Sequence, residues 1–336
     1  MKDFSSIVNS SKIKLMRNMI GFKFPSMLDG EEGIKTLNKT ADNILKLNPS
    51  YKLYKMKTLP ELDSNIMHEK GLISENLIDA VAYGAVILSP DEHLSIMVNE
   101  SDHIVEQFTL PGLNLISAYD NINAIDNQIL SNLDIAYDDS IGFLTSSVKN
   151  VGTGMRASVS LFLPALTILG KVKEIAASVA NEDIELTSFG DEGTSSSAYN
   201  YFVTNNLTIG KRETDFIVRI TECVLKICDM EIRARNELLS NKNIDSVKDK
   251  IFRAWGILTN CYKIEVDEAQ KLLGELKMGV ALDLVRFKDV NFIDNLIIDI
   301  KPYSLTKLSG SKVSMTELDK YRASFLTNVL KSKRIK

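Results

Sequence analysis

A strand-like segment followed by a glycine-punctuated turn carries the residues best suited to chemistry. Residues 142–163 read Gly-Phe-Leu-Thr-Ser-Ser-Val-Lys-Asn-Val-Gly-Thr-Gly-Met-Arg-Ala-Ser-Val-Ser-Leu-Phe-Leu, with Gly152 and Gly154 in the turn and Arg156 just after it. Glycines let backbone N–H groups approach a phosphate closely, and an arginine offers a planar two-pronged donor. The pattern predicts an anion cradle, although a glycine turn between two core elements explains it as well.

The same segment resembles the signature loop of the ATP:guanidino phosphotransferases, and it is most similar to that of the bacterial protein-arginine kinases. Four further blocks carry the resemblance in the family's order: Ser10–Asn18, Met97–His103, Gly190–Thr194 together with Asn205–Gly210, and Leu318–Ala323. The resemblance implies an α+β fold. Residues 1–242 would form a phosphagen-kinase-type catalytic domain, with an antiparallel sheet flanked by helices. Residues 243–336 would form an all-α, phosphoarginine-receptor-like domain.

Members of this family move the γ-phosphoryl group of MgATP onto a guanidinium nitrogen. Negative charge spreads over the transferring oxygens in the transition state, so positioning and cationic donors dominate catalysis. The nitrogen is a poor nucleophile while it is protonated, so a carboxylate must orient the guanidinium and take its proton. The resemblance therefore implies MgATP as the nucleotide and a protein arginine as the acceptor.

The resemblance places nucleotide contacts at Ser10, Ser11, Lys12, Ile13, Lys14, Gly71, Val105, Arg156, Ala157, Ser158, Val159, Ser160, Thr187, Ser188, Phe189, Gly190 and Asp191. The phosphate-holding arginines of the family fall at positions that are here Lys12, Lys14, Val105, Arg156 and Thr187. Lysine keeps the charge but not the planar fork, and valine and threonine keep neither. Each lost charged hydrogen bond is worth about 1.5–3 kcal/mol, so we expect MgATP binding to be weak or absent.

At three of these positions the residue type alone does not establish a nucleotide contact. Gly71 stands where protein-arginine kinases usually have a histidine near the nucleotide, so a base or phosphate contact is lost there. Lys12 and Lys14 alternate with apolar residues in a predicted strand, and a solvated basic strand face would show the same pattern. The motif context favours the phosphate role.

The acceptor side is altered as well. Ser101 replaces the family's catalytic glutamate and Ser147 replaces the cysteine beside the guanidinium, while Glu192, the second guanidinium-contacting carboxylate, is retained. A serine is not a general base at neutral pH, and this loss alone could cost about 100- to 10,000-fold in rate. Glu100 is a weak substitute, because neighbours in extended backbone point to opposite sides. Its alternative role is that of a loop-supporting carboxylate.

The distribution of these changes favours a degenerate kinase. The glycines and apolar residues of the motifs persist, as do Asn99, Asp102 and His103, some of which only hold loops together. We therefore favour a protein-arginine kinase relative with little or no phosphotransfer, acting through protein partners in stress response or proteolysis. The alternative is an active kinase that uses Glu192 with Glu100 or a lysine in new roles.

The C-terminal block carries a second binding motif. The family's Arg-Asp-x-x-Arg-Ala motif receives phosphoarginine as an allosteric signal, and its positions here are Leu318, Asp319, Arg322 and Ala323. Asp319 and Arg322 share a helix face, so the aspartate could hold the guanidinium and the arginine the phosphoryl group. Leu318 replaces the lead arginine, which weakens or abolishes the site. An ordinary intrahelical Asp–Arg pair explains the spacing equally well.

Family resemblance also implies partners: a zinc-binding activator, a heat-shock repressor and a Clp-type unfoldase, with a homodimer as one expected assembly. The net charge of −4 gives no drive toward nucleic acid or anionic membrane. No run is apolar over the length of a membrane span, and the N-terminus lacks a signal-peptide core, so we expect a cytoplasmic protein. Only nine residues precede Ser10, where small-molecule phosphagen kinases carry a helical domain, which favours the protein-arginine branch.

Composition and cysteine usage indicate an ordinary globular chain. It has 336 residues, of which 44% are hydrophobic and 25% charged, enough for a large domain and a smaller one. Cys223 and Cys228 lie in an apolar helical segment and are more readily explained as buried inert thiols than as metal ligands. The three histidines have no zinc-site spacing, so no metal site is predicted.

These residues must be positioned by regular elements. Periodicity predicts strands at residues 10–18, 85–88, 94–98, 103–110, 141–145 and 184–189. It predicts helices at 33–47, 113–133, 164–180, 211–239, 247–262, 266–284 and 316–330, with a mixed helical region at 59–82. We expect Ile34 and Met230 to lie on the apolar faces of their helices.

Overall fold

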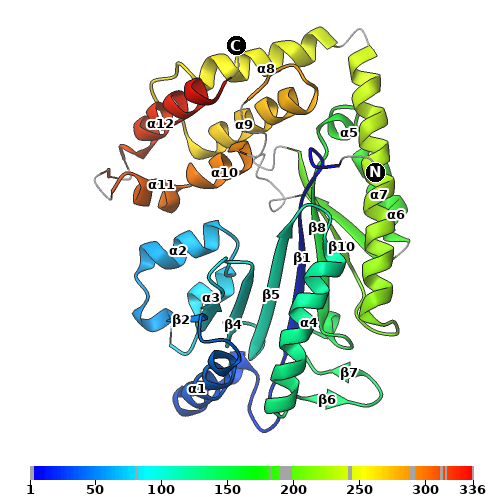
Figure 1. The fold of residues 1–336 in the computed structure, drawn as a ribbon, viewed down its shortest axis with the longest axis vertical. Helices are drawn as coiled ribbons and strands as arrows, with labels where there is room; N and C mark the ends of the chain where they lie inside the picture. The colour runs from blue at the N-terminus through cyan, green and yellow to red at the C-terminus, as the bar shows by residue number, and fades with distance from the viewer. Residues whose placement is uncertain are drawn as a thin grey trace.

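The structure, a computed structural model, describes residues 4–80, 82–181, 183–188, 199–240, 244–287, 292–310, 313–314 and 316–334. Figure 1 shows an α+β architecture, with one large sheet, helices packed against it and a C-terminal helical region beyond one end of the strands. This is the predicted fold class. The predicted division at residue 242 falls outside the described residues and stays a prediction.

An eight-stranded antiparallel sheet forms the centre of the described part, in the order β2-β3-β4-β5-β1-β8-β10-β9. Its strands are β1 (Val8–Arg17), β2 (Lys52–Lys55), β3 (Ala85–Leu88), β4 (Leu94–Val98), β5 (Ile104–Pro111), β8 (Met155–Phe162), β9 (Ile184–Ser188) and β10 (Asn200–Asn205). A separate two-stranded ribbon pairs β6 (Tyr137–Asp138) with β7 (Gly142–Phe143).

Helices fall into two groups along the chain. Those before residue 241 are α1 (Gly30–Leu47), α2 (Glu61–Glu69), α3 (Glu75–Asp79), α4 (Leu115–Asn132), α5 (Pro164–Ile168), α6 (Val172–Ala180) and α7 (Glu213–Ser240). Those of the C-terminal helical region are α8 (Ile244–Leu258), α9 (Val266–Ala281), α10 (Phe292–Asp299), α11 (Pro302–Leu308) and α12 (Leu318–Lys333). None of the described helices is long and apolar enough to cross a membrane.

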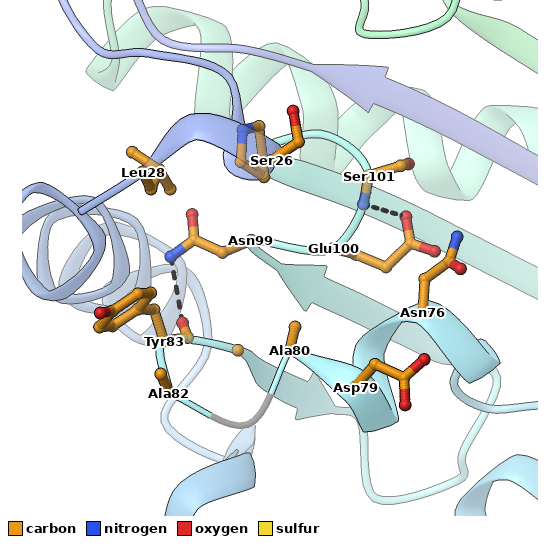
Figure 2. A pocket seen from close by; sticks show the side chains of 12 residues that line it. Ser26, Leu28, Asn76, Asp79, Ala80, Ala82, Tyr83, Asn99, Glu100 and Ser101 are labelled. Atoms are coloured by element: carbon orange, nitrogen blue, oxygen red, sulfur yellow. Dashed lines mark hydrogen bonds between the residues drawn. The ribbon is translucent and has the colours of Figure 1, made fainter. Parts of the chain in front are cut away.

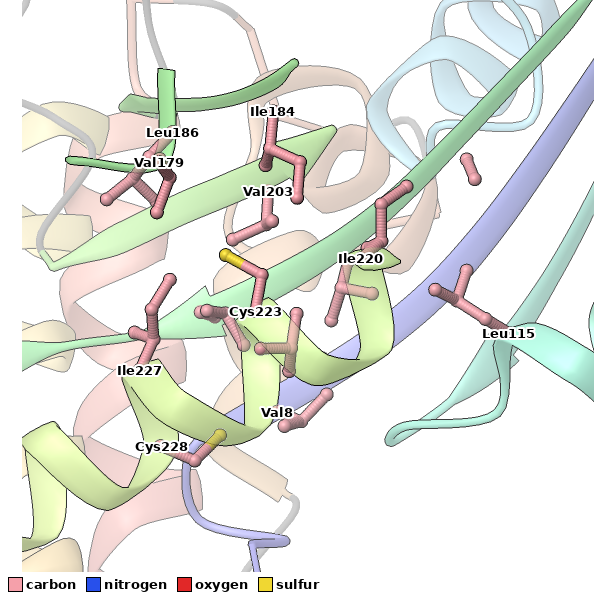
Figure 3. Close-up of a cluster of buried hydrophobic side chains, with 14 of the residues drawn as sticks. Val8, Leu115, Val179, Ile184, Leu186, Val203, Ile220, Cys223, Ile227 and Cys228 are labelled. Carbon is pink, nitrogen blue, oxygen red and sulfur yellow. The ribbon is translucent and has the colours of Figure 1, made fainter. Parts of the chain in front are cut away.

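One face of the sheet is buried under helices α4 and α7 (Figure 1). Ile13 and Leu15 of β1 point to this face because alternate strand residues share a side, and they pack in the same core as Ile220, Cys223 and other α7 residues. Figure 3 shows this core, where the helix presents residues three and four apart to the strands. The opposite face of β1 is thus left free for polar residues.

A second core holds the C-terminal helical region together. It is built from helices α8, α9, α10 and α12, and Phe162 at the end of β8 belongs to it. Lys277 of α9 lies over the Phe162 ring at 4.7 Å and donates to Asn9 Oδ1 at 2.8 Å. Trp255 packs against this core, with the Arg334 guanidinium 4.5 Å from its ring. The region is therefore joined directly to the sheet.

Most predicted elements are confirmed, and the differences have physical reasons. Strands β2, β8 and β10 were not predicted; the residues of β8 follow the glycine turn directly and belong to the predicted anion-binding motif. Residues 141–145 do not return to the main sheet but contribute β7 to the small ribbon. The predicted helix at 164–180 is two helices, α5 and α6, separated at Gly170, which has a φ of +69°.

Two expectations about helix faces were wrong. Ile34 is 53% exposed and Met230 is 44% exposed, although both fit the apolar spacing of their helices. Each lies at the edge of the apolar stripe, where Leu37 on α1 and Ile227 on α7 already fill the contact with the sheet. The thiols of Cys223 and Cys228 are buried, as predicted, and Cys261 is half-buried.

Candidate functional site

A cleft of about 1240 Å³ lies between the polar face of the sheet and the C-terminal helical region. Its floor comes from β1, β5, β8 and β10, and one side is the turn at residues 68–73 that follows α2. The other side is α10, with Gln270 of α9 and Lys301 between α10 and α11. Segments far apart in sequence therefore share this one cavity, which is called the cleft below.

Strand register arranges a polar row on the floor of the cleft. Lys12 of β1 lies opposite Thr109 on β5 and Ser158 on β8, and Lys14, two residues further, lies opposite Gln107. All of these residues line the cleft. The predicted strand thus presents its two lysines on one side, beside neutral hydrogen-bonding groups that can also contact an anion. Ser10 and Ser160 extend the same lining.

Four other predicted nucleotide positions point away from the cleft. Ile13, Ala157 and Val159 are buried in the core beneath the helices. Ser11 is buried too, and its hydroxyl donates to the Gly112 carbonyl at 2.7 Å. Their side chains serve the fold, so a ligand in the cleft would reach these residues only through their main chain.

The two lysines of the floor are unneutralised among the described residues. No carboxylate oxygen of that part of the chain lies within 4.0 Å of Lys12 Nζ or Lys14 Nζ. Burial, with a further contribution from Lys14, lowers the pKa of Lys12 to about 8. Burial also lowers the pKa of Lys14, although Glu100 opposes that shift. Both findings describe cations that a bound anion would stabilise.

Gly71 sits beside Lys12 at the turn after α2. Its φ of +73° belongs to the left-handed region that favours glycine, and its carbonyl accepts from Gln107 Nε2 at 2.8 Å and from Lys12 Nζ at 3.5 Å. The position that the family usually gives to histidine therefore contributes only a carbonyl to the cleft.

Two positions that hold phosphate-binding arginines in the family carry uncharged residues here, and neither residue faces the cleft. Val105 is 3% exposed and packs with Met16 and Met97 in a core beneath α2 and α3. Thr187 is exposed on the edge strand β9, opposite Phe202 of β10, and Ser188 next to it is exposed as well. Neither Val105 nor Thr187 lines the cleft.

Arg156 is held by neighbouring polar groups rather than pointing freely into the cleft. Its Nε donates to Asn150 Oδ1 at 2.9 Å and its Nη1 to the Asn205 carbonyl at 2.5 Å. Burial lowers its pKa, and Glu185 partly opposes that shift. The sequence block at residues 205–210 thus turns out to anchor the arginine of the signature loop.

The loop glycines serve close packing. A Cβ on Gly154 would lie 2.6 Å from Arg17 Nη1 and 2.7 Å from the Met16 carbonyl, and one on Gly152 would lie 2.3 Å from the Thr208 carbonyl. Both glycines have positive φ. At these two positions the structure favours the core-turn explanation over direct phosphate contact.

The Glu100 carboxylate is held by two hydrogen bonds, one from the start of helix α3 and one from its own loop. Its carboxylate accepts from Ser74 Oγ at 2.6 Å and from the Ser101 N–H at 2.5 Å, as Figure 2 shows for the second bond. Burial raises the pKa of Glu100, but hydrogen bonds from Ser101 and Ser74 outweigh burial, so the net pKa is below its ordinary value. A carboxylate held this way is a poor proton acceptor, which favours its loop-supporting role.

Ser101 and the serines after Thr145 come together at one end of the sheet. Ser146 Oγ donates to the Ser101 carbonyl at 2.6 Å, and the Ser146 N–H donates to Asp102 Oδ1 at 2.7 Å. Asp102 also accepts from Asn18 Nδ2 at 2.6 Å. The fold therefore brings the positions of the family glutamate and cysteine, Ser101 and Ser147, onto adjoining loops. It also shows Asp102 holding those loops together.

A smaller cavity of about 360 Å³ adjoins Ser101 (Figure 2). It lies between the loop at residues 25–28, helix α3 and the loop at 99–101, and Asp79 and Asn76 lie on one side of it. Asn99 is anchored beneath it, since its Nδ2 donates to the carbonyls of Gly33 and Tyr83 at 3.2 and 3.0 Å. This cavity borders the predicted acceptor side of the site.

The residues of the C-terminal motif are buried or hydrogen-bonded within the helical region. Arg322 is 2% exposed, and it donates to the carbonyls of Ile300 at 2.9 Å and Ile264 at 2.8 Å and to Asp319 Oδ1 at 2.5 Å. Leu318 and Ala323 are buried. The spacing thus yields an Asp–Arg pair that also anchors two neighbouring turns, which favours the intrahelical-pair explanation.

Four residues of the predicted site lie outside the described residues: Phe189, Gly190, Asp191 and Glu192. Within the described residues, no group of three histidine, cysteine, aspartate or glutamate side chains could hold a metal ion. Among functional candidates, Gln107 could have been found by extending the strand alternation of 103–110. Lys301 had no signal in the sequence, because only the tertiary fold brings it to the cleft.

The fold and the site define a class. Residues 33–234 match the family model described as ATP:guanido phosphotransferase, C-terminal catalytic domain, and residues 244–336 match that described as Protein-arginine kinase McsB C-terminal domain. Among solved structures, the duplicated taurocyamine kinase of Schistosoma mansoni resembles the chain with a TM-score of 0.62 at 22% identity, covering 78% of this chain and 40% of that one. Lombricine kinase gives 0.60 at 20% identity, covering 69% and 67%. These likenesses show a phosphagen kinase fold.

Protein-arginine kinases from several bacteria are similar to this chain over nearly its whole length. A protein-arginine kinase of Caldanaerobacter subterraneus subsp. tengcongensis is 35% identical over 331 residues, covering 97% of this chain and 98% of that protein. Those of Geobacillus thermodenitrificans and Bacillus cereus are each 33% identical, covering 97% of this chain and 91% and 93% of their own lengths. The chain belongs to the protein-arginine kinase family.

Proposed function

We propose that this family member has lost, or retains only a small part of, the transfer of the MgATP γ-phosphoryl group to protein arginine. The observation that carries the proposal is the replacement of the base. Ser101 offers a hydroxyl where the family has its catalytic glutamate, and the adjacent Glu100 is held by Ser74 and by the Ser101 N–H. Without a free carboxylate at this position, the family's proton acceptor is lost, and a guanidinium nitrogen that stays protonated is a poor nucleophile.

The phosphate side supports the same proposal. Val105 is buried among apolar side chains and Thr187 is exposed at the sheet edge, so neither can supply the cation of the family position. Arg156 already makes two hydrogen bonds to its neighbours. The cleft keeps the Lys12 and Lys14 ammonium groups, which lack the planar fork that matches a phosphate. We therefore expect weak MgATP binding and poor stabilisation of the transferring phosphoryl group.

An active kinase is the second candidate. It is favoured by the unneutralised lysines on the floor of the cleft and by Glu192, which remains in the sequence. In such an enzyme Glu192 would take the proton and the lysines would hold the phosphates in a rearranged site.

If phosphotransfer is lost, the chain acts by binding. We propose the partners that family resemblance implies: a zinc-binding activator, a heat-shock repressor and a Clp-type unfoldase, in a cytoplasmic stress-response or proteolysis pathway. A homodimer belongs to the same proposal. Direct binding to nucleic acid is not part of it, since the net charge is −4.

The test is a phosphoarginine assay with radiolabelled ATP and an arginine-rich protein, with and without an activator protein. The Caldanaerobacter relative, run in parallel, is the positive control. We expect incorporation by this chain at background level. Acid-labile incorporation that depends on this chain, and that approaches the control, would support the active-kinase candidate instead.

A further inference from the structure

Two lysines from different parts of the fold meet at the turn after α2. Lys12 Nζ of strand β1 donates to the Gly71 carbonyl at 3.5 Å, and Lys301 Nζ of the C-terminal helical region donates to the Glu69 carbonyl at 2.8 Å. The two acceptors are two residues apart at the end of α2, so the ammonium group from the floor and the one from the C-terminal helical region both approach this turn. Both lysines line the cleft.

Two of the carboxylates that line the cleft are paired with lysines other than Lys12, Lys14 and Lys301. Glu92 pairs with Lys70 at 2.8 Å and Asp294 pairs with Lys277 at 2.5 Å. Asp299 has no ion pair among the described residues; burial raises its pKa, and the charge of Lys70 partly opposes that shift.

Glu69 is likewise engaged. Its carboxylate accepts from the N–H groups of Tyr303 and Ser304 at 3.0 and 2.7 Å and from the Ser304 hydroxyl at 2.6 Å. Within the described residues, Lys12, Lys14 and Lys301 therefore have no carboxylate partner within 4.0 Å. Burial lowers the pKa of Lys301, as it does for the two lysines of the floor, although the charge of Glu69 opposes the shift at Lys301.

We propose that Lys301 is a phosphate-binding residue, which joins Lys12 and Lys14 in holding a polyphosphate chain, and that such a ligand links the sheet to the C-terminal helical region. Three ammonium groups around one cavity attract several adjacent negative charges. Lys301 supplies a cation that Val105 and Thr187 cannot supply. The proposal does not depend on whether phosphoryl transfer is retained.

Binding would also tighten the contact between the two parts. Lys301 precedes α11, and that helix already meets α2 through Glu69 and through the Lys307–Asp63 ion pair at 2.9 Å. A polyanion held by Lys12 on one side and Lys301 on the other adds a bridge across the cleft. The ligand class is a phosphate chain, alone or as part of a nucleotide.

The experiment is a calorimetric titration of the full chain with inorganic tripolyphosphate, which needs no catalysis. Lys301→Met and Lys12→Met should each weaken binding about tenfold, as expected for one charged hydrogen bond. Lys301→Arg should bind at least as tightly as the wild type, because it keeps the charge and adds a planar fork that matches a phosphate. The matched control is Lys307→Met, which removes a neighbouring lysine and a contact with α2 without removing a charge from the cleft.

Two further measurements separate binding from folding. Lys301→Gln removes the charge but keeps a donor for the Glu69 carbonyl, so it should weaken binding even where the methionine variant is unstable. Small-angle scattering should show tripolyphosphate making the wild type more compact and leaving Lys301→Gln unchanged. The proposal is overturned if the wild type does not bind tripolyphosphate, or if Lys301→Gln and Lys301→Met bind it as tightly as Lys307→Met does.

Discussion

Ser74 donates a 2.6 Å hydrogen bond to the Glu100 carboxylate while its own hydroxyl oxygen caps helix α3 by accepting from the Leu77 N–H. One side chain thus joins the start of a helix to the loop that carries Ser101.

Ser74→Ala should lower the free energy of unfolding by about 2 kcal/mol, because a helix cap and a charged hydrogen bond are both lost. Glu100→Gln should be destabilising near neutral pH. Since the pKa of Glu100 is lowered in the folded state, its contribution is present above the unfolded pKa and is lost as the pH falls through the folded one. Urea denaturation at pH 7 and pH 3.5 measures this. An unchanged difference between the wild type and Glu100→Gln at the two pH values would contradict it.

Restoring the base should restore some chemistry. Ser101→Glu combined with Thr187→Arg should raise phosphoarginine incorporation by about 100-fold over the parent chain, the contribution typical of a positioned general base. The control is Ser140→Glu on the exposed β6–β7 turn, which should change nothing. No gain from the double variant would mean that other lesions limit catalysis.

Val105→Arg should damage the fold rather than repair the site. The side chain would carry an unpaired charge into a core with Met16 and Met97, at an expected cost on the order of 3 kcal/mol. Thermal unfolding measures this, with Thr187→Arg on the exposed edge strand as the matched control. Equal melting temperatures for the two variants would contradict this prediction, because they would show that an arginine at position 105 reaches solvent or a partner instead of staying buried and unpaired.

Lys12 should make stability rise with pH in the alkaline range. Its pKa is about 8 in the folded chain against 10.5 for the ordinary group, so the unfolded state binds more protons between those values. Holding the charge is costly below pH 8, and the cost falls as the pH rises. Lys12→Met should therefore be stabilising at pH 7, with an advantage that shrinks by on the order of 3 kcal/mol up to pH 10.5. Lys46→Met, on the exposed side of α1, should show no such trend in urea denaturation.

Gly154→Ala should be far more harmful than Gly210→Ala. Both glycines have positive φ, but a Cβ at Gly154 meets Arg17 and the Met16 carbonyl, whereas one at Gly210 has no neighbour within 4 Å among the described residues. We expect losses of about 3 and 1 kcal/mol in the free energy of unfolding. Comparable losses for the two variants would show that the positive φ alone, and not the close approach of Arg17, accounts for the need for glycine at position 154.

Arg322→Met should destabilise the C-terminal helical region by about 3 kcal/mol, because two backbone carbonyls lose a charged donor. Free phosphoarginine should leave the melting temperature of the wild type unchanged, since Arg322 is already engaged. A rise with phosphoarginine that disappears in Arg322→Lys would show a working receptor site.

The sequence predicted β1 and β5, two of the four strands on the floor of the cleft, because their alternation is local. Lys12 and Lys14 follow from period two in β1, and the meander from Ala85 to Leu110 follows from its turn residues. The sequence could not decide between a catalytic and a loop-supporting role for Glu100. That choice depends on a hydrogen bond from Ser74, which lies 26 residues away.

Tertiary contacts explain the remaining differences. The role of Gly154 depends on where Arg17 packs, and the place of Lys301 depends on how α11 meets α2. Strand β8 was not predicted because its Arg156-Ala157-Ser158 segment also fits an anion-binding motif, although its burial alternates strictly along most of its length.

Trp255 is the chain's single tryptophan, and it lies against the second core with Arg334 over its ring. Its fluorescence therefore reports on the C-terminal helical region alone, whereas circular dichroism averages over both parts. A denaturation followed by both signals would show whether the two parts melt as one unit or in succession, with no label added to the molecule.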